Sequence, residues 1–232
     1  MITIRRSEAR GHADHGWLDT RHSFSFADYH DPAHVQFGGL RVLNEDRVAA
    51  GAGFPSHSHR DMEILTYVLE GALSHHDSLG NGSTIRPGDI QRMTAGTGVV
   101  HSEHNASNEN PVHFLQIWIL PERKGLAPGY EQRHFDALEF AGRFRCIAST
   151  DARDGSVLLH ADAALFVARL TAGQGVEHHW EAGRRAYIQI ARGGVRLDGE
   201  PLVAGDGARI ESAAQLRVEA DSDAEILLFD LA

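Results

Sequence analysis

The sequence contains a single cysteine, Cys146, and no long hydrophobic run. One cysteine excludes an internal disulfide and is typical of proteins from a reducing compartment. No apolar stretch reaches the length needed to cross a bilayer, and the first residues lack the apolar segment of a signal peptide. These absences predict a soluble, cytoplasmic protein without membrane association.

Positive charge is also scarce. The chain has 22 Lys and Arg residues against 32 Asp and Glu residues, which gives a formal net charge of -10. An acidic surface repels phosphate backbones, so we expect no direct contact with nucleic acid. Any effect on transcription would have to act through protein partners.

Strand signals dominate what is present. Short apolar, β-branched stretches alternate with turn residues, and 24 of the 232 residues are glycine. We expect strands over residues 64–69, 72–76, 112–120, 156–160 and 165–170, turns at 79–82 and 87–89, and one short helix over 136–140. The pattern predicts an all-β fold.

One polar stretch divides the chain. Residues 121–132, PERKGLAPGYEQ, carry two prolines, two glycines and several charges, which is typical of a linker. We therefore expect one domain over residues 1–120 and a second over residues 133–232.

The second half repeats the order of features of the first half. Alignment of GFPSHSHRDMEILTYVLEGAL with GQGVEHHWEAGRRAYIQIARGGVR indicates an internal duplication of a β-domain. The predicted correspondences are His59 with His179, Tyr67 with Tyr187, and Asp89 with Asp206.

Four residues of the first half can converge on one point. Residues i and i+2 of a strand point to the same side, so His57 and His59 direct two imidazoles to one place. His101 and Glu103, in TGVVHSEHN, repeat this geometry. If both segments line one barrel, three imidazoles and one carboxylate meet there. This set suits a divalent first-row transition metal and is too rich in nitrogen for Ca²⁺ or Mg²⁺.

The second half lacks such a set. His178 and His179 are adjacent, so on a strand they point to opposite faces and cannot both reach one ion. No histidine follows Asp206 where the counterpart of His101 would lie. We expect the second domain to be degenerate and without metal.

The sequence resembles a known family. GAGFPSHSHRDMEILTYVLEG, RPGD and TAGTGVVHSEHN resemble the two motifs of the cupin fold. FSFADYHDP, GGLRVLNED and HSHRDMEI are more narrowly similar to the pirin family, in particular to its bacterial quercetin-dioxygenase-like members. The resemblance covers residues 17–120 closely and the second half loosely. It implies two cupin domains in tandem, each a jelly-roll β-barrel, forming a bicupin.

The resemblance also implies a ligand set and a cofactor. The metal ligands of the family fall on His57, His59, His101 and Glu103, and they imply one divalent transition metal. Fe(II) is the first expectation, and Mn, Ni, Cu, Co and Zn are alternatives. Glu63 is a rival for Glu103, because it has the parity of the first histidine pair and its counterpart is a ligand in other cupins. Glu103 or Glu63 would accept the substrate proton in catalysis.

The family further implies oxygenolytic cleavage of a flavonol such as quercetin by O₂, with ring opening and release of carbon monoxide. Phe37, Phe54 and Met62 are candidates to pack against this small aromatic substrate. Two alternatives remain open: a metal- or redox-sensitive regulator that acts through protein partners, and a cupin enzyme of another class. We expect a monomer.

Overall fold

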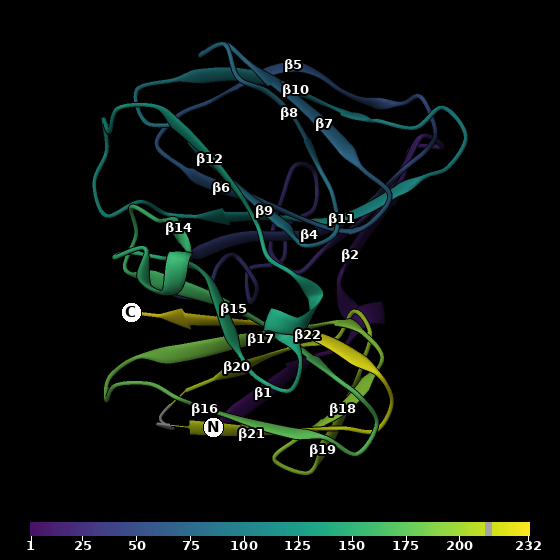
Figure 1. The fold of residues 1–232 in the computed structure, drawn as a ribbon, viewed down its shortest axis with the longest axis vertical. Coiled ribbons are helices and arrows are strands. Elements are labelled where there is room, and N and C mark those ends of the chain that lie inside the picture. Colours follow the sequence, from purple (N-terminus) through teal and green to yellow (C-terminus); the bar gives the residue numbers. More distant parts are fainter. Residues whose placement is uncertain (212–214) are drawn as a thin grey trace. The chain divides into compact units, whose positions relative to one another are not determined.

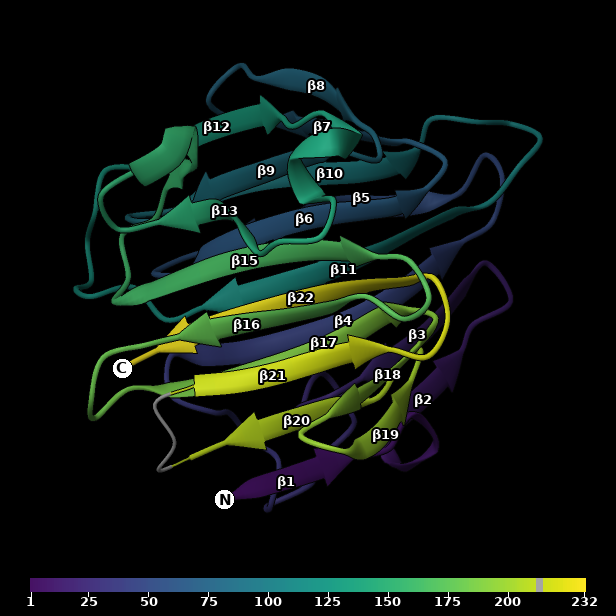
Figure 2. The same ribbon diagram turned by 60° about the horizontal axis from the view of Figure 1, so that its bottom comes forward.

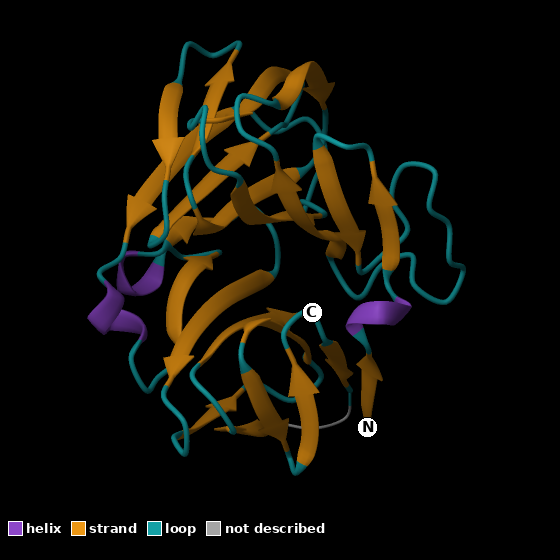
Figure 3. Cartoon of the chain, turned by 90° about the vertical axis from the view of Figure 1, so that its right-hand side faces the viewer, coloured by secondary structure: helices purple, strands orange, loops and turns teal. Residues whose placement is uncertain are grey.

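The computed structural model describes residues 1–211 and 215–232, and Figure 3 shows a chain built almost entirely of strands. The expected all-β fold is confirmed. Within these two ranges the helical elements are three short 3₁₀ turns, at Ser7–Ala9, Ala137–Phe140 and Arg153–Gly155. The second of them corresponds to the helix expected over residues 136–140. None of the described helices is long or apolar enough to span a membrane.

The chain forms two compact units. The N-terminal unit comprises residues 11–135 and 157–161, and the C-terminal unit comprises residues 1–10, 136–156 and 162–232. Each unit is built from a large and a small antiparallel sheet.

In the N-terminal unit the large sheet has the order β12-β9-β6-β11-β4-β3-β2, and the small sheet has the order β5-β10-β7-β8 (Figure 1). The strands of this unit are β2 (Gly11–Asp14), β3 (Leu18–His22), β4 (Leu40–Val48), β5 (Gly53–His59), β6 (Glu63–Glu70), β7 (Leu73–Asp77), β8 (Gly82–Ile85), β9 (Asp89–Thr94), β10 (Val99–Asn105), β11 (Val112–Ile119), β12 (Gly129–His134) and β14 (Val157–Leu158).

In the C-terminal unit one sheet runs β1-β20-β17-β22-β15-β13 and the other runs β16-β21-β18-β19. Figure 2 shows β15, β22 and β17 side by side. The strands of this unit are β1 (Ile2–Arg5), β13 (Arg145–Ser149), β15 (Ala163–Leu170), β16 (Gly175–His179), β17 (Arg185–Arg192), β18 (Gly194–Leu197), β19 (Glu200–Val203), β20 (Gly207–Ile210), β21 (Gln215–Ala220) and β22 (Ala224–Leu231).

The sequence predicts domain boundaries at residues 120 and 133, but the strand pairs divide the chain at other positions. The supposed linker, 121–132, runs into β12, which pairs antiparallel with β9 and so extends the large N-terminal sheet. Conversely, β1 pairs with β20, and the Ser7 N–H donates to Asp206 Oδ1 at 2.7 Å. The first ten residues therefore complete the C-terminal sheet. Composition could not reveal this exchange, because an edge strand is assigned by the partner that hydrogen-bonds to it.

One of the three predicted correspondences between the halves is confirmed. Asp89 N–H donates to the Arg86 carbonyl, and the Asp89 carboxylate accepts from the Arg86 N–H. Asp206 makes the same two bonds with Val203. Both aspartates close the same turn before a strand.

The other two predicted correspondences are wrong by one and two residues. Tyr67 pairs with the residue after Asp89, whereas the residue after Asp206 pairs with Gln189 and not with Tyr187. The tyrosines therefore occupy different positions in the two units.

The histidine of β16 that matches His57 is His178. The ends of the pairs β5–β10 and β16–β21 match, because Asn105 N–H donates to Ala52 and Ala220 N–H donates to Gln174. Counting back along each ladder places His57 opposite His101 and His178 opposite Leu216. The counterpart of His59, two residues further on, is then Trp180. The predicted match is off by one because β5 has one extra residue, at its bulge, between Ala52 and His57.

Candidate metal centre

The histidines of the predicted site lie on neighbouring strands. β5 and β10 pair antiparallel, with His57 directly opposite His101. Side chains alternate along β10, so that His101 and Glu103 are buried while His104 is exposed. The i, i+2 parity inferred from the sequence therefore describes each strand correctly.

A bulge in β5 shapes this end of the ladder. The register shifts by one residue between the pair His101–His57 and the pair Glu103–Phe54. Pro55 lies in this irregular stretch, where the lack of a backbone N–H costs no ladder bond. The Pro55 carbonyl accepts a hydrogen bond from Nδ1 of His57 at 2.8 Å. The bulge thus orients the first histidine of the pair.

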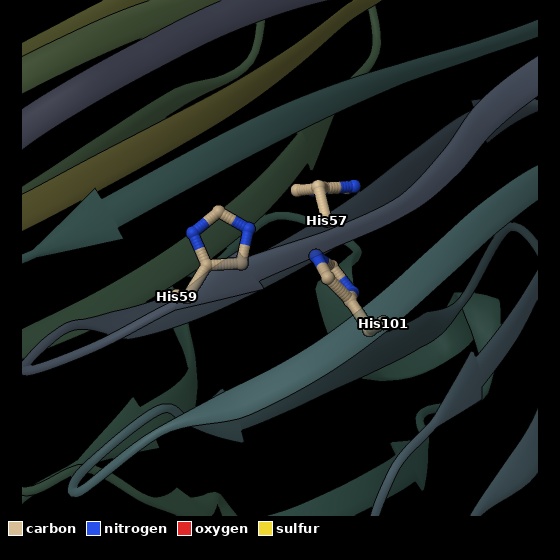
Figure 4. A group of neighbouring side chains, drawn as sticks. All are labelled: His57, His59 and His101. Carbon is tan, nitrogen blue, oxygen red and sulfur yellow. The ribbon is translucent and has the colours of Figure 1, made fainter.

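Three imidazoles converge in front of these strands (Figure 4). The ring centroids of His57 and His101 are 4.4 Å apart, and His59 lies 4.8 Å from each of the other two rings. One nitrogen from each ring lies within 4.8 Å of the others. The three rings are spaced as the ligands of a single ion would be.

The hydrogen bonding of His57 and His101 and the protonation state of His59 and His101 also fit a cation. His101 Nε2 is buried and has no hydrogen-bond partner among the described residues, which is unusual for a buried ring nitrogen. The bond from His57 Nδ1 to the Pro55 carbonyl occupies Nδ1 and leaves Nε2 to face the other two rings. Burial lowers the pKa of His101 to about 3, and burial together with His57 lowers the pKa of His59 to about 4. Both rings are therefore neutral at pH 7, as metal ligands must be.

Glu103 lies beside this cluster, on the same face of β10 as His101. A carboxylate oxygen lies within 4.8 Å of ligand atoms of His101 and His75, in a second group of potential ligands. Glu103 does not belong to the tighter group formed by the three imidazoles of His57, His59 and His101. The structure thus brings the predicted fourth ligand to the edge of the cluster.

The Glu103 carboxylate is held by uncharged donors. The side-chain amide of Gln116 donates to both oxygens, at 3.2 and 3.0 Å, and the Thr66 hydroxyl donates at 3.4 Å. Burial outweighs these bonds and raises the pKa of Glu103 to about 7. No arginine or lysine neutralises this carboxylate in the interactions that the structure describes, which leaves its charge available to a cation.

Glu63 lies elsewhere. It is fully buried at the start of β6, and its Oε2 accepts a hydrogen bond from the His160 N–H at 3.1 Å. Burial raises its pKa against the opposing effect of this bond. Glu63 belongs to neither group of potential ligands among the described residues. The parity argument fails here because the chain turns between β5 and β6, where Asp61 has a φ of 51°.

The sequence analysis missed His75, which follows no obvious spacing. It lies on β7 and is fully buried, and its register partner on β10 is Glu103. Its Nδ1 lies 3.4 Å from Nδ1 of His101. Only the pairing of β7 with β10 brings His75 to the cluster, and the sequence carries no direct signal of that pairing.

A mostly apolar pocket of about 230 Å³ opens beside the imidazoles. Trp118 forms part of its wall, packing edge-on against His59 at 4.9 Å and against Phe26 at 5.4 Å between ring centroids. The pocket is lined by His15, Leu18, Thr20, His22, Phe26, Ala27, Asn44, Asp46, Phe54, His57, His59, Glu103, Gln116 and Trp118. Of the three residues predicted to pack a substrate, Phe54 lines this pocket, whereas Phe37 and Met62 do not.

The chain is similar to known proteins along its whole length. Residues 3–119 match the family described as Pirin, and residues 146–231 match the quercetinase C-terminal cupin domain. The protein named quercetin 2,3-dioxygenase in Escherichia coli K12 is 48% identical over 231 residues, covering 100% of this chain and 99% of the relative. A pirin-like protein of Caulobacter vibrioides is 41% identical and is covered over its full length.

Two solved structures share the fold closely. The crystal structure of YhhW from E. coli has a TM-score of 0.96 at 47% identity, with 100% of this chain and 98% of that chain covered. Bacterial pirin YhhW in complex with nickel(II) has a TM-score of 0.95 at 46% identity, with 100% and 99% covered. The chain is therefore quercetin 2,3-dioxygenase-like along its whole length, has two cupin domains in tandem, and belongs to the pirin family.

Proposed function

We propose that this protein is a metal-dependent dioxygenase that cleaves a flavonol such as quercetin with O₂, opening the ring and releasing carbon monoxide. One divalent transition metal would be held by His57, His59, His101 and Glu103. The observation that carries the proposal is the buried Nε2 of His101, which has no partner among the described residues and faces two further imidazoles beside an apolar pocket.

The donor set limits the metal without selecting one. Three imidazoles and one carboxylate accept Fe(II), Mn, Ni, Cu, Co or Zn. The nickel(II) complex of a similar protein supports binding of a divalent transition metal. We keep Fe(II) as the first expectation and use Ni(II) as a convenient probe. When bound, the ion would act as a Lewis acid that lowers the pKa of a substrate hydroxyl.

The side chains around the ion supply binding and proton transfer. Glu103 lines the pocket and is the residue we assign as acceptor of the substrate hydroxyl proton. Phe26, Phe54 and Trp118 offer aromatic surface to a planar substrate. Gln116 orients Glu103 and keeps it from turning away from the pocket. Glu63, bonded to the backbone of His160, would contribute only indirectly.

The pocket favours an enzyme over a purely regulatory protein. A metal that serves only to change a protein surface needs no apolar cavity next to its ligands, whereas a bound aromatic substrate does. The predicted monomer, the possible protein partners and the cytoplasmic location stay predictions.

The test is to strip the protein with a chelator and reload it under nitrogen with Fe(II), Mn(II) or Ni(II). Quercetin and O₂ are then added, and substrate absorbance and oxygen uptake are followed together. We expect stoichiometric oxygen consumption by the loaded protein and none by His57→Ala. His104→Ala is the matched control, since His104 is exposed on β10. Equal turnover by wild type and His57→Ala would refute the proposal.

A further inference from the structure

A buried chain of polar groups runs behind His101, away from His57 and His59. His75 and Asp77 on β7 have no exposed side-chain surface, and His75 Nε2 lies 3.2 Å from Asp77 Oδ2. On the other side of the ring, His75 Nδ1 lies 3.4 Å from His101 Nδ1 and 3.3 Å from the side-chain amide of Gln91. The Tyr130 ring stacks on His75 with 5.1 Å between centroids. Polar partners thus engage both ring nitrogens of His75 and hold the ring in place.

The proton positions in this chain follow from its carboxylate end. An ionised aspartate can only accept, so His75 Nε2 must carry a proton that it donates to Asp77. In a neutral imidazole the other nitrogen is then an acceptor, which agrees with the Gln91 amide donating to it. The 3.4 Å contact between the two Nδ1 atoms is a hydrogen bond only when His101 is the donor, sharing the lone pair of His75 Nδ1 with Gln91. In that arrangement the proton of His101 is on Nδ1, and its Nε2 is left with a lone pair.

We propose that the Asp77–His75 pair is a positioning device that fixes the tautomer of His101, so that the unprotonated Nε2 of His101 faces the metal. This inference rests on the proposed metal site and adds two residues to it. The partners behind a metal ligand commonly fix ring orientation and proton position in this way.

His75 could instead be a ligand, because its nitrogens lie near Glu103 and His101. Its hydrogen bonds argue against this. Both ring nitrogens are already engaged, one by Asp77 and the other by Gln91 and His101. A ligand role would require breaking the buried bond to the Asp77 carboxylate or the two bonds at Nδ1, whereas His101 Nε2 has no partner to lose.

One substitution of nearly equal side-chain volume should reverse the donors and acceptors along this chain of polar groups. Asp77 Oδ1 accepts from three donors, the Leu79 N–H, the Asn81 N–H and the Asn81 side-chain amide. In Asp77→Asn these donors would retain the amide oxygen at that position and turn the amide nitrogen towards His75 Nε2, with loss of the bond that the Asn81 side-chain amide also donates to Asp77 Oδ2 at 2.9 Å. His75 then becomes an acceptor at Nε2 and carries its proton on Nδ1. His101 must respond by moving its proton to Nε2, which blocks the metal-facing lone pair.

The experiment uses the full-length, chelator-stripped protein. Long-range proton–nitrogen correlation spectra of ¹⁵N-labelled protein report the tautomer of His101, and calorimetric titration reports Ni(II) affinity. Asp89→Asn is the matched control, because Asp89 forms another aspartate–histidine pair, with His134 at 2.8 Å, outside the cluster. Spectra of the metal-free wild-type protein report the tautomer of His101 directly. They therefore test the inference even if Asp77→Asn folds poorly.

We expect wild-type His101 protonated on Nδ1, Asp77→Asn protonated on Nε2, and about 10- to 100-fold weaker Ni(II) binding by Asp77→Asn. Asp89→Asn should keep wild-type values in both measurements. A wild-type His101 with its proton on Nε2, or unchanged affinity in Asp77→Asn, would overturn the inference. Neither readout involves quercetin. A protein that binds Ni(II) with the expected tautomer but consumes no oxygen would therefore refute the oxygenase function alone.

Discussion

The two units of this protein share strand order and turns, but their interiors have opposite chemistry. Strand registers allow the comparison residue by residue. His59, Thr66, His75, Gln91, His101, Glu103 and Gln116 of the N-terminal unit correspond to Trp180, Ile188, Leu197, Ala208, Leu216, Val218 and Leu228 of the C-terminal unit. Six of these seven polar residues have a purely aliphatic counterpart. The seventh, His59, corresponds to Trp180, whose indole is mostly apolar.

His178 is the histidine that the C-terminal unit retains at the position of His57. Its ring packs against Phe166 at 4.4 Å and lies 6.1 Å from Trp180 between centroids. The counterparts of His101 and Glu103, Leu216 and Val218, carry no donor atom and lie in the apolar core. The two units therefore show that the same strand positions can carry either metal ligands or apolar core residues. A small number of side chains determines which of the two is present. Buried polar groups are costly unless they have partners, which explains why an unused site becomes apolar.

The largest expected effect comes from giving the N-terminal unit a residue of the C-terminal one. His101→Leu removes a nitrogen donor that nothing else replaces. We expect Ni(II) affinity to fall by more than about 100-fold, since loss of a supporting partner alone costs up to that much. Calorimetric titration measures it, and His104→Leu on the exposed face of the same strand is the control. Wild-type affinity in His101→Leu would place the metal elsewhere.

A substitution in the C-terminal unit tests the apolar role of the position that matches His59. Trp180 is 7% exposed and belongs to the C-terminal core. Trp180→Ala should lower the free energy of unfolding by about 3–5 kcal/mol. His59→Ala, at the matching position, should change the stability of the metal-free protein far less and abolish tight metal binding. Denaturant unfolding in the presence of a chelator compares them. Equal losses of stability would contradict the division of roles.

The third comparison concerns a buried carboxylate of the N-terminal unit. Asp46 lies in the N-terminal pocket, whereas its register counterpart in the C-terminal unit is Ala168. Burial raises the pKa of Asp46 from 3.8 to about 7, opposed by a hydrogen bond from Thr20. The folded state therefore holds this proton more tightly than the unfolded state, and stability falls as the pH rises from about 4 to about 7.

Asp46→Asn should reduce this fall, to which the raised pKa of Glu103 also contributes, and raise the free energy of unfolding at pH 8 by roughly 2 kcal/mol. A shift of about three pKa units is equivalent to about 4 kcal/mol, and the altered bond to Thr20 offsets part of it. Urea unfolding of the metal-free protein from pH 4 to pH 8 provides the measurement. An unchanged slope with pH would show that Asp46 is ionised in the folded protein.

The smallest expected effect concerns Gln116, whose counterpart is Leu228. Gln116→Leu removes both amide bonds to Glu103. We expect Ni(II) binding to weaken by about 10-fold, since Glu103 loses orientation but stays in place. A titration beside wild type measures it. Unchanged affinity would indicate that Glu103 is not a ligand.

The sequence was sufficient wherever the relevant geometry is local. The convergence of His57 with His59, and of His101 with Glu103, follows from strand parity alone, and the strands and hairpin turns follow from composition. The sequence could not supply relations created by pairing between distant strands. His75 reaches the cluster through β7–β10 pairing, β1 joins a sheet formed about two hundred residues later, and a bulge at Pro55 displaces the alignment of the two halves by one residue.

The central claim is tested most directly by a crystal structure of the nickel-loaded protein with anomalous data collected at the metal edge. The account predicts one strong anomalous peak per chain, within bonding distance of Nε2 of His57 and His101, a ring nitrogen of His59 and the carboxylate of Glu103. A peak beside His178 in the C-terminal unit, or no peak among the three imidazoles, would contradict it.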